Sequence, residues 1–210
     1  MKNVVVSQNY FIHDALGYLR DKKSDTATFR YFAEKLTHLL LSETLISTDL
    51  KGFEISTEFE KTPVGRISDK FVLIPILRAG ISMLNPALKL LPNAAVGFAG
   101  LFRDEKTAIA REYYWKVPSL ENSIVLILDP MLATGGSILH VLRKLRTVGQ
   151  KPKEIRIVSV VSAPEGIKTI HNQFPEVKIF TASIDQGLNS KKFILPGLGD
   201  FGDRFFKTEE

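Results

Sequence analysis

A glycine-rich segment that follows a buried-type strand is the part of the sequence best suited to chemistry. Five apolar residues at 124–128 lead to Asp129, and Thr-Gly-Gly-Ser at 134–137 opens an amphipathic helix. Backbone N–H groups at a helix N-terminus, glycines that admit an anion and nearby hydroxyls together suit phosphate binding. The acid at the strand end suits sugar hydroxyls or a metal-bound water. The segment therefore predicts a sugar phosphate as the ligand.

This pattern is moderately specific, because many nucleotide-binding loops are rich in glycine. It differs from a Walker A loop, since no Gly-Lys-Ser or Gly-Lys-Thr triplet closes it. It also lacks the Gly-x-Gly-x-x-Gly spacing of dinucleotide-binding loops.

Two arginines follow other predicted strands. Arg78 lies in the strand-to-helix segment 75–80, where a guanidinium can bind phosphate through two hydrogen bonds. The alternative for Arg78 is an ion pair with a surface carboxylate. Arg103 opens a charged segment that predicts a lid over a bound polyphosphate. The alternative there is an exposed hairpin tip, with the aromatic residues at 113–115 serving only the core.

The C-terminal segment 196–203 holds three glycines and one proline among its eight residues. This composition argues against a regular helix or a central strand. Such a loop exposes backbone N–H and C=O groups that suit the edges of a small planar heterocycle. The alternative is a plain loop whose carboxylates cap turns.

The earlier segment 162–166 is interpreted as structural, because Pro164 and Glu165 suit the first turn of a helix.

Strand and helix patterns alternate along most of the chain. The first residues predict a short helix near 12–19 and a longer one over 26–46, followed by an alternating strand over 53–59 and a turn that together suggest a hairpin arm. Buried-type strands follow at 71–77, 94–100, 124–128, 155–161 and 177–182, with helical patterns at 81–91, 137–148 and 164–174. This order predicts a mostly parallel sheet with helices on both faces and ligands beyond the carboxyl ends of its strands.

Composition narrows the class of protein. The 210 residues predict one domain, 1–210, and a 44% hydrophobic content is ordinary for a globular protein. The cysteine-free sequence has no apolar run near the 18 residues that cross a membrane and no signal-peptide core at its start, so a cytoplasmic protein is expected. The net charge of +5 comes from scattered residues, which argues against a nucleic-acid partner.

Five segments, taken together, resemble the uracil phosphoribosyltransferases of the type I phosphoribosyltransferase superfamily. They are Pro-Ile-Leu-Arg-Ala-Gly at 75–80, Asp-Pro-Met-Leu-Ala-Thr-Gly-Gly-Ser at 129–137, Ala-Pro-Glu-Gly-Ile at 163–167, Thr-Ala-Ser-Ile-Asp-Gln-Gly-Leu-Asn at 181–189 and Pro-Gly-Leu-Gly-Asp-Phe-Gly-Asp at 196–203. They occur in the family's order and span essentially the whole chain. Superfamily members generally carry two adjacent acids where this chain has Asp129 and Pro130, a departure that resembles the uracil enzymes specifically.

The resemblance implies an α/β, type I phosphoribosyltransferase-like fold with a mostly parallel central sheet flanked by helices. It adds an N-terminal helical segment, a β-hairpin arm near 52–66, a lid loop near 103–117 and a C-terminal base-binding region near 184–204. The implied reaction transfers the phosphoribosyl group of 5-phosphoribosyl-1-pyrophosphate (PRPP) to uracil, giving uridine monophosphate (UMP) and pyrophosphate. Mg²⁺ is expected to bind mainly through PRPP, without a dedicated protein metal site.

The resemblance also implies roles for individual residues. Catalysis is assigned to Asp200, Arg78 and Arg103. PRPP binding is assigned to Arg78, Arg103, Asp129, Pro130, Met131, Leu132, Ala133, Thr134, Gly135, Gly136, Ser137 and Asp200. Uracil is assigned to Ile194, Gly199, Asp200 and Phe201, chiefly through their backbone groups.

Two departures from the family pattern affect the lid and the base region. Related lids read closer to Glu-Thr-Leu-x-Pro-Val-x-Tyr-Tyr, whereas Lys-Thr-Ala-Ile-Ala-Arg-Glu at 106–112 precedes Tyr113 here. The family's frequent tyrosine before Ile194 is Phe193, which removes a hydroxyl. Both departures affect expectations about kinetics and leave the phosphate-binding segment unchanged.

Other readings stay open at this point. One alternative is a regulator that keeps the fold and binds RNA in response to nucleotides. Its expected signs are a concentrated basic face and a double-acid ribose motif, and the sequence shows neither. Another is a superfamily enzyme that uses a purine base, which is disfavoured by the long loop at 196–204 that resembles the uracil family's. The resemblance further implies a homodimer or higher homo-oligomer with the hairpin arm as candidate contact, and guanosine triphosphate (GTP) is a candidate effector because it activates some relatives.

Overall fold

The computed structural model describes residues 2–103 and 110–208. Its elements in chain order are β1 (Val4–Val6), α1 (Tyr10–Arg20), α2 (Thr26–Thr44), β2 (Leu50–Ser56), β3 (Lys61–Ile67), β4 (Lys70–Leu77), α3 (Ile81–Leu90), β5 (Ala95–Val96), β6 (Phe98–Arg103), β7 (Ala110–Lys116), β8 (Ser123–Leu128), β9 (Met131–Leu132), α4 (Gly136–Thr147), β10 (Glu154–Ser162), α5 (Pro164–His171), β11 (Lys178–Ile184), β12 (Gly187–Leu188), β13 (Ile194–Leu195) and α6 (Phe201–Phe206).

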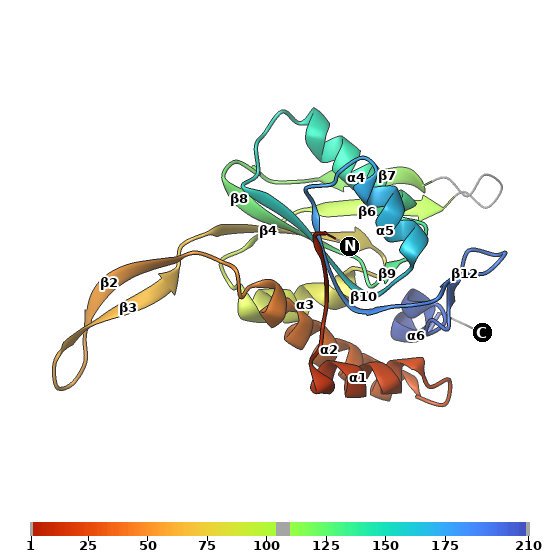
Figure 1. The fold of residues 1–210 in the computed structure, drawn as a ribbon, viewed down its shortest axis with the longest axis horizontal. Coiled ribbons are helices and arrows are strands. Elements are labelled where there is room, and N and C mark those ends of the chain that lie inside the picture. Colours follow the sequence, from red (N-terminus) through yellow and green to blue (C-terminus); the bar gives the residue numbers. More distant parts are fainter. Residues whose placement is uncertain (1, 104–109, 209–210) are drawn as a thin grey trace.

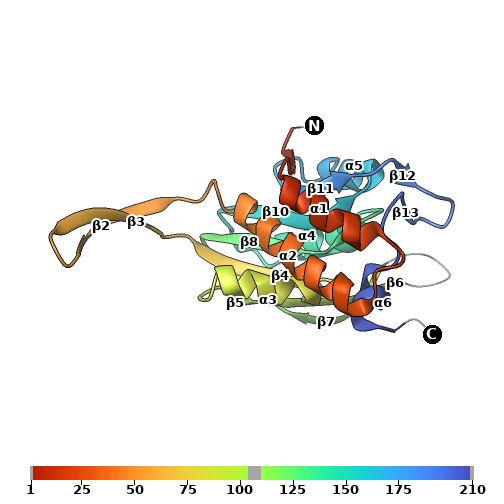
Figure 2. The ribbon, with the colours of Figure 1, turned by 90° about the horizontal axis from the view of Figure 1, so that it is seen from below.

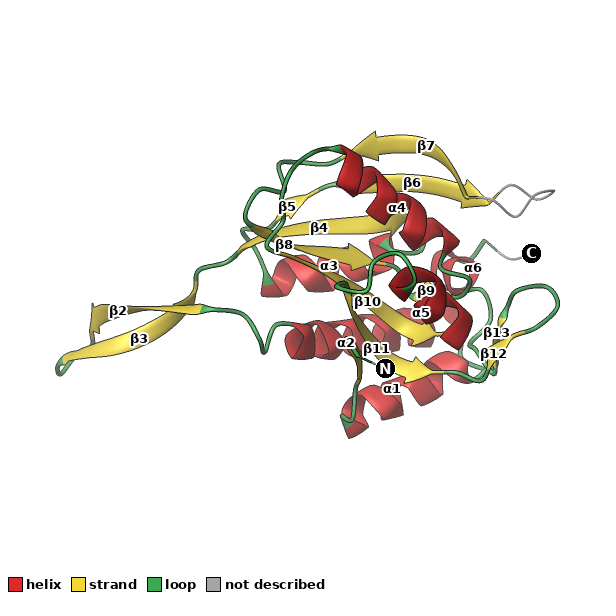
Figure 3. Ribbon diagram, turned by 45° about the horizontal axis from the view of Figure 1, so that its top comes forward, coloured by secondary structure: helices red, strands yellow, loops and turns green. Residues whose placement is uncertain are grey.

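A mostly parallel sheet forms the centre of the described chain (Figure 1). Its strand order is β1-β11-β10-β8-β4-β6-β7, with β5 paired to β4 and β9 paired to β10. The β6–β7 pair is antiparallel, and the other pairs in this sheet are parallel. Figure 3 shows the carboxyl ends of the central strands pointing toward the side where β12, β13 and α6 lie. The sheet thus gathers its strand-end segments at one rim, as the sequence pattern predicted.

Helices cover both faces of this sheet. Alternate residues of β4 point to opposite faces, so that Phe71 and Leu73 join one apolar cluster while Val72 and Ile74 join another. Helices α1, α2, α3 and α6 contribute to the first cluster, and α4 and α5 contribute to the second. Figure 2, which views the molecule from below, shows α1, α2 and α3 lying together in front of the sheet. Burial on both faces explains why the central strands are continuous apolar runs in the sequence.

Strands β2 and β3 form an antiparallel hairpin that projects from the body of the molecule (Figure 1). Register pairs run from Leu50 with Ile67 to Ser56 with Lys61, so this arm is longer at its root than the expected 52–66. At the root, Lys153 bonds the carboxylates of Asp49 and Asp69 at 2.7 and 2.6 Å.

Several elements differ from the sequence-based expectation. The short β1 was not predicted and pairs with β11. The predicted strand over 94–100 is divided at Gly97, whose N–H donates to Leu73 O at 2.9 Å. Much of the expected lid over 103–117 is regular structure, because residues 110–116 form β7 against β6. Residues 104–109 lie outside the described part of the chain.

The expectation of no regular helix within 196–203 is wrong at its end. Helix α6 begins at Phe201, and Asp200 caps it by accepting a 3.0 Å hydrogen bond from Asp203 N. This side-chain cap offsets the poor helix propensity of Gly202. Within 2–103 and 110–208, no helix has the length and apolar character needed to cross a membrane.

Candidate functional site

The predicted phosphate-binding segment lines a small pocket at the start of α4. The pocket has a volume of about 140 Å³ and is lined by Asp129, Met131, Leu132, Ala133, Thr134, Gly135, Gly136, Ser137 and Ile138. Gly135 precedes the helix with φ +80°, a left-handed conformation that favours glycine. The hydroxyl of Thr134 accepts a 3.4 Å hydrogen bond from Gly136 N. The turn therefore presents a helix N-terminus and hydroxyls to one concave space.

Pro130 fixes the segment to the sheet. Its carbonyl accepts hydrogen bonds from Val160 N and Val161 N at 3.0 and 3.1 Å. The two residues that follow, Met131 and Leu132, form β9 beside β10. The phosphate segment thus begins from a strand-like connection, which sequence reasoning treated as a simple loop.

Asp129 lines this pocket and is partly buried. Burial raises the pKa of its carboxyl to about 7, although a hydrogen bond from Met131 N to Oδ1 at 3.2 Å opposes that shift. The carboxylate can accept hydrogen bonds from a sugar placed above the pocket. Such donors would favour the ionised form.

The Arg78 segment lies between the phosphate segment and the C-terminal region. A Cβ on Gly80 would overlap Leu128 O, so the turn after β4 packs directly on the strand that leads to Asp129. On its other side Arg78 Nη2 lies 3.3 Å from Asp203 Oδ1. The Arg78 side chain is 62% exposed, so the guanidinium remains open to a ligand.

The predicted base-binding residues lie around a second pocket of about 510 Å³. Phe193, Ile194, Pro196, Gly199, Asp200 and Asp203 line it. Phe201 is not among them: its side chain is buried and packs edge-on against Phe29 with ring centroids 5.0 Å apart. A role of Phe201 toward a ligand is therefore confined to its backbone.

The short hairpin β12–β13 sets the orientation of Ile194. Leu188 is the register partner of Ile194, and Asn189 N donates to Phe193 O at 2.9 Å beside this pair. Hydrogen-bonded and non-hydrogen-bonded pairs alternate along an antiparallel ladder. Ile194 takes the second kind of position, from which its backbone N–H and C=O point away from β12.

The backbone of Arg103 ends β6 at the same rim, because β6 pairs in parallel with β4. Its side chain lies outside the described part. After the undescribed residues, Glu112 of β7 connects to α4: Oε2 accepts from His140 Nε2 at 3.1 Å, and Oε1 pairs with Lys144 Nζ. Strand β7 is therefore attached to the helix that follows the predicted phosphate-binding segment. Tyr113 and Tyr114 are exposed, whereas Trp115 packs against the core and lies under Lys144.

Sequence reasoning missed three acidic side chains that organise the site. Asp203 meets Arg78, and Asp185 is bonded to Arg20. Glu165 was interpreted as a helix-dipole residue, but its Oε1 also accepts from Leu188 N at 3.1 Å and so joins α5 to β12. For Glu165 and Asp185 the available signal was a carboxylate placed shortly after a buried strand, in the segments 162–166 and 181–189. Asp203 lies in α6 and carried no such signal.

Another cavity, of about 460 Å³, lies at the opposite ends of β4 and β8, lined by residues that include Phe71, Leu90, Ala94 and Ser123. None of the predicted site residues reaches it, and parallel sheets bind ligands at their carboxyl ends. The rim with Asp129, Arg78 and Asp200 is therefore the candidate active site.

Comparisons with known proteins match nearly the whole chain. The family model described as uracil phosphoribosyltransferase matches residues 6–208. The uracil phosphoribosyltransferase of Campylobacter fetus subsp. fetus is 41% identical over 209 residues, covering 99% of this chain and 99% of that protein. That of Fervidobacterium nodosum is 44% identical over 200 residues, covering 94% and 96%.

A solved structure is also similar throughout. The structure of AQ2163 protein from Aquifex aeolicus superposes with a TM-score of 0.91 at 37% identity, covering 97% of both chains. The predicted family resemblance and the predicted type I phosphoribosyltransferase-like architecture are both confirmed.

Proposed function

The chain belongs to the uracil phosphoribosyltransferase family, and on this premise we propose that it transfers the 5-phosphoribosyl group of PRPP to uracil, releasing pyrophosphate. The observation that carries the proposal is the arrangement of three segments at one rim. The turn of Arg78 contacts the strand before Asp129 on one side and Asp203 of the base pocket on the other. A sugar phosphate, its leaving group and a base would thus have adjacent places.

The 5′-phosphate is assigned to the pocket that residues 133–137 form at the start of α4. Backbone N–H groups and the hydroxyls of Thr134 and Ser137 would hold it, helped by the positive end of the helix dipole. Asp129 would accept hydrogen bonds from the ribose 2′- and 3′-hydroxyls. Its place in the lining of the same pocket supports this role, because the ribose is bonded to the phosphate.

The pyrophosphate is assigned to Arg78 and Arg103. Exposure of the Arg78 guanidinium and its place between the two pockets support this assignment. Bound Mg²⁺ would neutralise charge on the pyrophosphate. Among residues 2–103 and 110–208, no group of three acidic or histidine side chains forms a ready-made metal site. The single carboxylate of Asp129 fits a cation that takes most of its ligands from substrate and water.

Uracil is assigned to the pocket beside β13. The backbone groups of Ile194, Gly199 and Phe201 would read its polar edges, and the outward orientation of Ile194 in the ladder supports this. Asp200 lies in the same pocket wall. Its carboxylate would accept charge or a proton as uracil N1 attacks the anomeric carbon.

The proposed chemistry is substitution at the anomeric carbon without a protein nucleophile. One bond forms from uracil N1 to that carbon while the bond to pyrophosphate breaks, through an oxocarbenium-like transition state. Catalysis would arise from positioning, neutralisation of the leaving group and exclusion of water. Closure of the lid segment would protect PRPP from hydrolysis.

A nucleotide-sensing RNA-binding regulator on the same fold is not favoured, because the matched family and the curated relatives are named as transferases.

The proposal extends to a homo-oligomer in which the β2–β3 arm contacts a second copy. Phe59 at the arm's tip is 92% exposed, which supports such a contact. Measuring UMP formation with and without added GTP tests whether GTP is an effector.

The direct test is UMP formation from PRPP, Mg²⁺ and uracil by the wild type and by Arg78→Ala. UMP formed by the wild type and strongly reduced in the variant supports the assignment. UMP formation that is undiminished in Arg78→Ala would contradict the role of Arg78, and a wild type that forms none would contradict the proposed reaction.

A further inference from the structure

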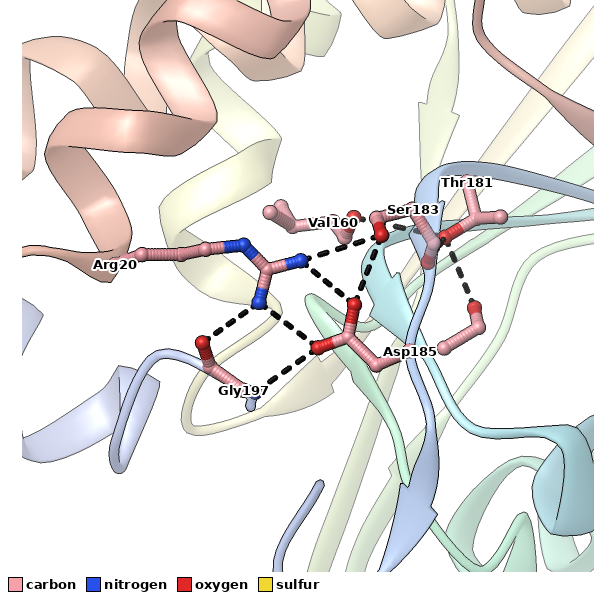
Figure 4. Close-up of polar contacts among 7 residues, drawn as sticks. Arg20, Val160, Thr181, Ser183, Asp185 and Gly197 are labelled. Atoms are coloured by element: carbon pink, nitrogen blue, oxygen red, sulfur yellow. Dashed lines mark hydrogen bonds and ion pairs between the residues drawn. The ribbon is translucent and has the colours of Figure 1, made fainter. Parts of the chain in front are cut away.

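A buried carboxylate outside the reacting groups lies behind the base pocket. Asp185 follows β11 directly, and its side chain is only 1% exposed. Both of its oxygens bond the guanidinium of Arg20, the last residue of α1: Nη2 to Oδ1 at 2.6 Å and Nη1 to Oδ2 at 2.8 Å (Figure 4). Ser183 Oγ also donates to Oδ1 at 2.8 Å. Arg20 and Asp185 therefore form a bidentate ion pair, which fixes the orientation of both side chains.

The pair holds both backbone groups of one loop residue. Gly197 N donates to Asp185 Oδ2 at 2.9 Å, and Gly197 O accepts from Arg20 Nη1 at 2.7 Å (Figure 4). Gly197 has φ +60°, and a Cβ there would overlap the carbonyl oxygen of Ile194. The loop therefore has a fixed point at this glycine.

That fixed point lies within the segment that forms the base pocket. Ile194 and Pro196 precede Gly197, Gly199 and Asp200 follow it, and all four line the pocket. Arg20 and Asp185 do not line it themselves. Their contacts would thus influence a base only through the backbone that they hold.

The elements that carry Arg20 and Asp185 are themselves held in place by the core and by hydrogen bonds. Leu16 and Leu19 bury α1 in the core beside the sheet, which leaves Arg20 little freedom to move its Cα. On the sheet side, Thr181 Oγ1 donates to Ser183 O at 3.0 Å (Figure 4). The same Oγ1 accepts from Ser162 Oγ at 3.0 Å. The position of the loop is therefore fixed relative to both the sheet and α1.

We propose that Arg20 is a positioning residue of the base pocket, which acts through Asp185 and Gly197 to preorganise the backbone that recognises the base. The inference rests on the proposed function for the identity of the base. Preorganisation by this pair lowers the ordering cost of binding the base, and neither Arg20 nor Asp185 lines the pocket at the start of α4. A lysine cannot replace Arg20 fully, because one ammonium group cannot reproduce the planar fork.

The test compares Arg20→Lys and Arg20→Gln with the wild type, and uses Arg30→Lys as the matched control. Arg30 also donates to a backbone oxygen near the C-terminus, Phe205 O at 2.7 Å, but that oxygen belongs to α6 and not to the segment 194–200. Steady-state kinetics would give KM for uracil and for PRPP separately. Hydrogen–deuterium exchange would report the backbone amides of residues 194–200 without reference to activity.

Arg20→Lys is expected to raise KM for uracil by about tenfold, the size of effect expected when one well-formed hydrogen bond to a charged group is lost. KM for PRPP should stay nearly unchanged. Exchange at 194–200 rises in Arg20→Lys and not in Arg30→Lys. Equal increases in both KM values, unchanged exchange, or the same result in Arg30→Lys would overturn the inference. If Arg20→Gln does not fold, Arg20→Lys decides the matter. A wild type that forms no UMP contradicts the proposed function instead, and the exchange measurement still tests Arg20.

Discussion

Gly135 and Gly166 lie against each other across two segments of the site: a Cβ on Gly135 would lie 2.9 Å from the carbonyl oxygen of Gly166. Gly135 precedes α4 in the proposed phosphate-binding turn, and Gly166 lies in the first turn of α5. A Cβ on Gly166 would also overlap Ala133 O. The α5 segment, which the sequence analysis interpreted as structural, therefore packs against this turn and supports it.

Gly166→Ala is expected to push the turn out of shape and lower kcat/KM for PRPP by about tenfold or more, equivalent to a loss of roughly 1.4 kcal/mol or more of transition-state stabilisation. Gly17→Ala is the matched control, because Gly17 is in α1 and a Cβ there meets nothing within 4 Å. The control should keep full activity and be slightly more stable. Kinetics that are equal for both variants would show that the Gly135–Gly166 contact does not shape the pocket.

The raised pKa of Asp129 predicts a pH-dependent stability. Burial raises the pKa of this carboxyl from 3.8 to about 7, so the folded protein binds more protons than the unfolded chain between these values. This group therefore makes the free energy of unfolding fall as pH rises through that window, by at most about 4 kcal/mol. Urea unfolding of wild type and Asp129→Asn at about pH 5 and about pH 8 measures the difference. Asp129→Asn should lose this part of the pH dependence. The same change in the free energy of unfolding between the two pH values in both proteins would contradict the raised pKa of Asp129.

Substrate binding should reverse that shift. Ribose hydroxyls that donate to Asp129 favour its ionised form, so PRPP binding at neutral pH is expected to release a proton. Isothermal titration calorimetry in two buffers of different ionisation enthalpy counts the released protons. Asp129→Asn should release fewer, and equal release by both proteins would remove Asp129 from the ribose site.

Asp200→Asn separates catalysis from folding. Asparagine keeps an oxygen that can accept from Asp203 N, so α6 remains capped and the melting temperature should hardly change. The neutral amide cannot accept a proton from uracil, and kcat is expected to fall by about a hundredfold, a typical contribution of a general base. Thermal unfolding and the pH profile of kcat measure the two effects. Near-normal turnover with an unchanged profile would show that the carboxylate charge has no role.

Glu112→Gln tests the attachment of β7 to α4. Burial opposes ionisation of Glu112, but hydrogen bonds from Lys144 and His140 outweigh it and lower the pKa below 4.5. The contact therefore stabilises the protein above that pH and is lost as pH falls through the lowered pKa. The variant should lose about 1 kcal/mol of unfolding free energy near neutral pH.

Glu54→Gln is the matched control for that loss. Its 3.5 Å pair with Lys61 lies on the exposed arm, where ion pairs contribute little. Urea unfolding of both variants gives the comparison. Equal losses would mean that the Glu112 contacts do not hold β7 to the phosphate-binding helix.

Much of the fold was predictable because buried parallel strands leave apolar runs in the sequence. The strand that ends at Leu128 and the helix that follows Gly135 were recognised in this way. The segment β1 was missed because three valines carry too little pattern, and its pairing with β11 depends on distant residues. Helix α6 was missed because a side-chain cap at Asp200 overrides local glycine content.

Site residues could be proposed from the sequence only where a motif is continuous along the chain. The segment proposed to bind phosphate is one such motif, since its loop and helix are adjacent in sequence. The pair of Arg20 with Asp185 joins residues 165 positions apart and therefore required the tertiary structure. The contact of Arg78 with Asp203, across 125 positions, required it as well.

The measurement that tests the central claim most directly is product formation from PRPP and Mg²⁺ with uracil, cytosine, hypoxanthine and orotate in parallel reactions. The proposed base pocket predicts UMP from uracil and no nucleotide from the other three bases. Turnover of another base in place of uracil would keep the phosphoribosyl transfer and contradict the assignment of residues 194–201. No turnover of any base, with PRPP still bound, would contradict the enzymatic function itself.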